Sequence, residues 1–147
     1  MSGFSRFALL IVFCALWPLA LLAQSERPDQ AKVMRVWYDL TLDLVRHTPT
    51  YTPPVASRAL GYIGVTTFEA TASGDGGLMS LAGQLNGLSA LPERMPGEAY
   101  DEALVLHSAL STVVAGLFRN TGPTGQRALN AVTEKLGAGI ADGLDDG

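Results

Sequence analysis

Two histidines, His47 and His107, are the side chains best suited to acid–base or metal chemistry, and both lack the partners that such chemistry needs. His47 follows an arginine at the predicted end of a helix, where a cation satisfies the last carbonyl groups and the helix dipole. His107 falls in the middle of a predicted helix, which favours a partly buried, hydrogen-bonded side chain. Neither histidine has a carboxylate and a second histidine one turn away, so the sequence contains no helical metal pair.

The other residue types that support catalysis also stand outside the motifs they need. No serine occupies the Gly-x-Ser-x-Gly motif, in which a nucleophile stands on a sharp turn between a strand and a helix. The glycine-rich segment 74–77 lacks the lysine of a phosphate-binding P-loop and the alternating oxygens of an EF-hand. We interpret this segment as a turn, and we predict no catalytic, cofactor-binding or metal-binding residue in the chain.

Glu69 is the carboxylate with the most unusual setting, because it falls within a strongly apolar helix. A buried carboxylate needs a charged or hydrogen-bonding partner. Arg58 precedes it by eleven residues, which is about three helical turns and places both side chains on roughly the same face. We therefore predict structural roles for Arg58, Glu69 and His107, with Arg58 neutralising a carboxylate between packed helices and Glu69 as the candidate.

Hydrophobic periodicity predicts that four α-helices carry these residues, over about residues 31–47, 55–71, 98–118 and 124–141. The second is apolar on most faces, which is typical of a buried helix. Between the second and third, we expect a glycine-rich break, then a short helix at most, then a loop. Residues 142–147 read as a frayed acidic end that packs against nothing. The predicted fold class is all-α: an antiparallel helical bundle, or the N-terminal part of a larger one.

The N-terminus has the pattern of a secretory signal peptide over residues 1–23. Arg6 supplies the basic start, an apolar run covers residues 7–23, and polarity returns at Gln24. We expect residues 24–147 to form one helical domain that is periplasmic or secreted; the alternative is a membrane anchor formed by residues 7–23. The one cysteine, Cys14, lies inside this segment, so we expect no disulfide partner.

The charge of the chain makes nucleic acid an improbable partner. The formal net charge is −4, and no basic patch with interleaved aromatic residues occurs. Without such a patch there is nothing to neutralise a phosphate backbone.

One longer stretch is similar to a known family. It resembles the N-terminal region of secreted bacterial vanadium-dependent haloperoxidase-like proteins, which belong to the type 2 phosphatidic acid phosphatase superfamily. The similarity covers about residues 33–120 and rests on helix-packing positions: a Trp-bearing helix, a Pro-Pro-x-Ala-x-Arg-Ala helix that ends in an aromatic–acid–Ala triplet, and an alanine-rich helix with a histidine and an aromatic close. The matching residues are Trp37, Leu44-Val45-Arg46, Thr52-Pro53-Pro54-Val55-Ala56-Ser57-Arg58-Ala59-Leu60, Phe68-Glu69-Ala70, His107 and Leu117-Phe118.

The resemblance implies vanadate or phosphate as the bound group of the intact family, held by residues that this chain lacks. The family places a lysine ahead of an Arg-Pro pair, whereas here Arg27-Pro28 is preceded by Ala20 at that position. The family's Pro-Ser-Gly-His segment is also missing, and Ser57-Arg58 has no histidine in the following turns. We therefore expect a family member truncated before its catalytic motifs, and inactive alone in phosphoester hydrolysis or halide oxidation.

A second interpretation belongs to a different class of protein. The chain could be a self-standing periplasmic helical-bundle module that binds a partner through an apolar groove. A complete bundle hides its apolar helix faces, whereas a fragment leaves a contiguous apolar patch for a helical partner or for the missing C-terminal half. The two interpretations therefore differ in what covers the apolar face.

Overall fold

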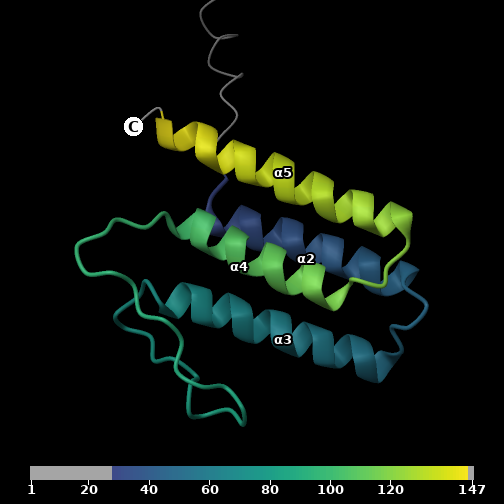
Figure 1. Cartoon of the computed structure of the whole chain (residues 1–147), viewed down its shortest axis with the longest axis horizontal. Helices are drawn as coiled ribbons and strands as arrows, with labels where there is room; N and C mark the ends of the chain where they lie inside the picture. The colour runs from purple at the N-terminus through teal and green to yellow at the C-terminus, as the bar shows by residue number, and fades with distance from the viewer. Residues whose placement is uncertain (1–27, 146–147) are drawn as a thin grey trace, which may run out of the picture.

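The fold is all-α, as predicted from the periodicity. The computed structural model describes residues 28–145, so the predicted signal peptide and the alternative anchor lie outside the described part of the chain. Four helices span Gln30–His47 (α2), Pro53–Ala72 (α3), Glu102–Leu117 (α4) and Pro123–Asp145 (α5) (Figure 1). No strand occurs within residues 28–145. None of the helices in this range is long and apolar enough to span a membrane.

The helices form a bundle in which successive helices run in opposite directions (Figure 1). α4 packs against each of the other three helices, and α5 also packs against α2. α3 packs chiefly against α4, so α3 and α5 lie on opposite sides of the bundle (Figure 1). The long segment 73–101, which links α3 to α4, runs along one end of the bundle and past α3 (Figure 1).

The core lies where α2, α4 and α5 meet. The helical spacing of Val33, Trp37, Leu40 and Leu44 brings all four side chains into it. Trp37 is fully buried, and so are Leu110 and Val114 of α4 and Ile140 of α5. At one end of the core the ring of Tyr51 stacks on that of Phe118, with 4.2 Å between ring centroids. Burial of each such side chain contributes roughly 1.5–3 kcal/mol.

The start of α4 differs from the prediction. The expected helix began at about residue 98, but Asp101 is extended and its side chain accepts a hydrogen bond from the backbone N–H of Leu104 at 2.8 Å. Aspartate is among the preferred N-cap residues because its carboxylate satisfies an otherwise unpaired amide. Gly97, with φ of +83°, makes a turn just before it. The helix therefore begins at Glu102.

The C-terminal end of α5 also corrects the prediction. Residues 142–145 continue the helix instead of fraying. Ile140 is fully buried and Leu136 nearly so, so the last turns are held against the core. A glycine within a helix costs about 1 kcal/mol relative to alanine, which is less than the burial of one such side chain contributes.

α3 is less buried than its apolar sequence indicated. Only Ala59, Ile63 and Glu69 are buried, all of them on the sides covered by α4 or by segment 73–101. Val55 and Tyr62 keep 44% and 54% of their surface exposed. Apolar residues of α3 are not confined to the side that α4 covers. Those on the outer side of the helix are therefore exposed to solvent.

Candidate functional site

His107 lies in the interior as part of a polar connection between three helices. It is 5% exposed, and its Nδ1 accepts a hydrogen bond from Nε1–H of Trp37 at 3.2 Å. The backbone of Thr133 on α5 also hydrogen bonds the ring. Burial lowers the pKa of His107, and the bond to Thr133 opposes this shift in part. A neutral imidazole is therefore fixed between α2, α4 and α5, where both ring nitrogens face protein groups.

His47 occupies the helix end where it was predicted. Its side chain is exposed, and Nδ1 lies 2.7 Å from the backbone oxygen of Asp43 one turn earlier. A neighbouring surface hollow of about 590 Å³ is bordered by His47, Asp43 and the start of α5. The two histidines belong to different parts of the bundle, one in the core and one at an exposed helix end, and the fold does not bring them together.

Glu69 is buried, but Arg58 is not its partner. Glu69 Oε2 accepts a hydrogen bond from the hydroxyl of Ser80 at 2.7 Å, and Oε1 accepts one from the backbone N–H of Leu81 at 2.6 Å. Arg58 is exposed on α3. Eleven residues of continuous helix separate the two by about 16 Å along the axis, which is too far for contact even on a shared face. The predicted Arg58–Glu69 pair is therefore wrong.

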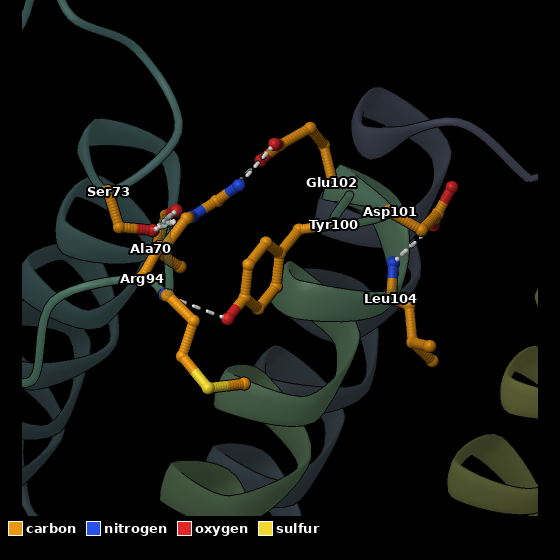
Figure 2. Close-up of polar contacts among 8 residues, drawn as sticks. Ala70, Ser73, Arg94, Tyr100, Asp101, Glu102 and Leu104 are labelled. Carbon is orange, nitrogen blue, oxygen red and sulfur yellow. Dashed lines mark hydrogen bonds and ion pairs between the residues drawn. The ribbon is translucent and has the colours of Figure 1, made fainter. Parts of the chain in front are cut away.

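A second charged group holds the other end of segment 73–101 (Figure 2). The guanidinium of Arg94 donates to both carboxylate oxygens of Glu102, at 2.6 and 2.8 Å. It also donates to the hydroxyl of Ser73, at 3.0 and 3.2 Å, and lies over the ring of Tyr100 at 5.0 Å. The hydrogen bond to Arg94 lowers the pKa of Glu102, although burial opposes that shift. We call this group the Arg94 clasp.

The Arg94 clasp and Glu69 together fasten the segment to the end of α3 and the start of α4. Ser73 follows α3 directly and Glu102 opens α4, so Arg94 joins both helices to the segment (Figure 2). Glu69 anchors the same segment nearer its beginning, at Ser80 and Leu81. A connection of this length without helix or strand is usually either functional or disordered. These contacts give it one defined course.

Between the two fastenings lies a hollow of about 320 Å³. Its polar lining residues are Glu69, Ser73, Ser80, Glu93 and Arg94, and the other lining residues are apolar. The hydroxyl of Ser80 donates to Glu69 and accepts from the backbone N–H of Ala82 at 3.0 Å. Both oxygens of Glu69 accept bonds from the segment, and Arg94 is bound to Glu102. Glu69, Ser80 and Arg94 thus hold the segment in place, whereas Glu93 is an exposed carboxylate that also lines the hollow.

The segment presents large apolar side chains to solvent. Met79 and Met95 are 78% and 64% exposed. Methionine side chains are flexible and polarizable, and they are common on surfaces that adapt to a partner. We call this surface the loop face; its exposed large apolar residues are Leu78, Met79, Leu85, Leu91, Met95 and Tyr100.

The outer side of α3 adds a second exposed surface. Val55, Arg58 and Tyr62 follow one another at three- and four-residue steps, which places them along one stripe of the helix. All three are exposed. We call this stripe the α3 stripe.

Neither metal chemistry within the described residues nor comparison with known proteins assigns a role to this site. Within residues 28–145, no three histidine, cysteine, aspartate or glutamate side chains are grouped so that they could hold a metal ion. No protein family, no curated protein and no solved structure matches this chain. The candidate site is therefore defined by its own geometry: the loop face, the α3 stripe and the contacts that hold them.

The sequence alone did not reveal either fastening. Arg94 and Glu102 are eight residues apart across a proline–glycine turn, and no periodic pattern relates them. Ser80 and Leu81 lie beyond a glycine-rich break from Glu69, so their contacts depend on how the segment folds back over α3. One signal of these contacts was present in the sequence, which is the position of Glu69 within an apolar helix. A buried carboxylate requires a partner.

Proposed function

We propose that this chain is an exported, non-catalytic helical packing unit that corresponds to the N-terminal helices of a vanadium-dependent haloperoxidase- or phosphatase-like protein. Its docking surface is the α3 stripe together with the loop face. The occupant is the helical body that carries the oxyanion-binding residues of such a protein.

The proposal rests on one observation about the stretch that resembles the haloperoxidase-like family, about residues 33–120. Some of its matching residues are buried, and others are exposed. Trp37, Ala59 and Phe118 are buried, and the packing of this unit accounts for them. Val55 and Arg58 belong to the same stretch, yet both are exposed along the α3 stripe. A second helical body seated on α3 would give these two residues the packing role that the family-like motif implies.

The exposed apolar residues of the loop face also favour the proposed docking surface. Twelve large apolar side chains in residues 28–145 are substantially exposed, and six of them fall within residues 73–101. Single exposed apolar residues are ordinary, whereas a contiguous apolar patch marks an interaction site, and the proposal takes these six residues to form one. Because the Arg94 clasp and Glu69 fix the segment, little ordering entropy is lost when a partner covers it.

Photo-crosslinking tests the surface and its occupant together. The photoreactive residue p-benzoylphenylalanine is placed at Tyr62 or at Met79 of the full chain in its own host, with exposed Asn130 on α5 as the matched control. We expect crosslinks from the first two positions only. Peptide sequencing should identify the captured chain as one that contains a Pro-Ser-Gly-His segment.

The same experiment distinguishes the second candidate, a self-standing binding module. A single captured protein without the family's anion-binding motifs would replace the haloperoxidase-like proposal with that module. Equal capture at Asn130, or none at Tyr62 and Met79, would rule out the docking surface itself.

Activity measurements test the non-catalytic part of the proposal. An oxyanion pocket needs several cations and hydrogen-bond donors that converge on one point. The basic residues after residue 23 are scattered singly along the chain. We expect purified protein to show no phosphatase or bromide-oxidising activity above background, with or without vanadate, and no saturable vanadate binding. Vanadate binding that disappears in His107→Ala would overturn this expectation.

A further inference from the structure

A groove on the opposite side of the bundle from α3 has a composition of its own. It lies between the first turns of α2 and the middle of α5, and its volume is about 500 Å³. Two lysines and six apolar or small residues line it: Pro28, Lys32, Val36, Ala131, Val132, Lys135, Leu136 and Gly139. The volume falls within the range of about 300–1,000 Å³ that is typical of small-molecule sites.

Helical spacing explains why these residues line one groove. On α5, Val132, Lys135, Leu136 and Gly139 recur at steps of three and four residues and so share one face. From Val132 to Gly139 this face extends about 10 Å along the helix. The wall from α2 includes Lys32 and Val36, which lie one turn apart. The floor is therefore apolar over about two turns, with a lysine on each wall.

The charge of the groove is opposite to that of the protein. The chain has a formal net charge of −4, yet both charged residues that line the groove are lysines. Neither ammonium group forms an ion pair with any residue in the described part of the chain. An anion entering the groove would thus meet two cations without displacing an existing carboxylate partner.

We propose that this groove binds the anion of a single medium-chain fatty acid. The carboxylate lies between Lys32 and Lys135, and the alkyl chain covers Val36, Val132 and Leu136. Ammonium groups provide charge-assisted hydrogen bonds to a carboxylate. The apolar floor removes CH₂ groups of the alkyl chain from water, which favours binding. This site does not depend on the docking surface proposed above, because α3 and α5 lie on opposite sides of the bundle (Figure 1).

Calorimetric titration of the full mature chain with laurate, below its micelle concentration, tests the proposal. We expect saturable binding of one laurate per chain that weakens with added salt. Lys32→Glu and Lys135→Glu should each weaken it by about tenfold, since each removes a charge-assisted bond and adds repulsion. Arg127→Glu, an equal charge change on α5 outside the groove, should leave the affinity unchanged.

Two further measurements distinguish binding at this site from non-specific hydrophobic binding. Val132→Trp should block the groove and abolish laurate binding while circular dichroism stays unchanged. Dodecanol, which has the chain without the charge, should bind at least tenfold more weakly than laurate. The proposal is overturned if laurate shows no saturable binding, if Arg127→Glu weakens binding as much as Lys135→Glu, or if dodecanol binds as tightly. Binding to phosphatidylglycerol vesicles without binding of free laurate would also overturn it.

Discussion

Replacing His107 by leucine tests whether this histidine connects the helices of the core. Leucine is apolar and can fill the buried site, but it cannot accept the hydrogen bond that Trp37 Nε1–H donates at 3.2 Å. A buried donor left without a partner costs about 1–3 kcal/mol. We expect the free energy of unfolding to fall by that amount. Adding Trp37→Phe removes the unpaired donor, so the double variant should lose less than the sum of the two single variants.

The same histidine should make stability depend on pH. Burial lowers the pKa of His107 in the folded protein. In the unfolded chain a histidine titrates near its ordinary pKa of about 6.5. As the pH falls through that value, the unfolded state binds more protons than the folded state, so the free energy of unfolding decreases. The decrease ends once the pH is below the lowered pKa of the folded form.

Urea unfolding of a chain that begins at Gln24 measures both effects. Trp37 is the one tryptophan after residue 23, so its fluorescence reports on the core directly. Unfolding curves at about pH 5.5 and 7.5 bracket the ordinary titration range of histidine. His47→Gln is the matched control because His47 is exposed, and this variant should keep the pH dependence that His107→Leu loses. Unchanged stability of His107→Leu at the higher pH, or pH dependence that His47→Gln loses instead, would refute the reasoning.

Further substitutions and one processing site give additional expected outcomes. Arg58→Ala should leave the free energy of unfolding within about 0.5 kcal/mol of the parent, as measured by urea unfolding, because the side chain is exposed. Glu69→Ala should destabilise the protein by about 1–3 kcal/mol in the same assay, because it leaves the N–H of Leu81 without its acceptor. Arg94→Met should speed limited proteolysis within residues 73–101 while the helical circular dichroism is retained, since the clasp holds that segment; unchanged cleavage would contradict a fastening role. N-terminal sequencing of exported protein should begin at Gln24, and full-length protein held in the membrane would favour the anchor instead.

Local sequence rules were sufficient to predict the helices. The three- and four-residue spacing of Val33, Trp37, Leu40 and Leu44 predicts one buried face, and all four are buried. Helix ends were less predictable where they depend on distant packing. The glycine-bearing last turns of α5 read as frayed, but burial of Ile140 against the core keeps them helical.

The contacts of the candidate site depend on tertiary structure and could not be read from periodicity. The predicted pairing of Glu69 with Arg58 relied on their similar angular positions around the helix axis. It did not take into account the distance between them along that axis. The actual partners, Ser80 and Leu81, come from an irregular segment whose course no local pattern specifies. The exposure of one side of α3 could not be predicted for the same reason. An apolar helical sequence predicts burial, but it does not indicate how many neighbouring helices are present.

The two proposed sites involve different helices of the bundle. α2, α4 and α5 share a core around Trp37, whereas α3 packs chiefly against α4 and carries the clasped segment with it. A partner on the α3 stripe and loop face should therefore slow amide hydrogen exchange mainly in α3 and residues 73–101. A fatty acid between α2 and α5 joins two helices of the shared core, so its binding energy adds to the global free energy of unfolding. The pattern of exchange protection thus distinguishes occupancy of one site from occupancy of the other.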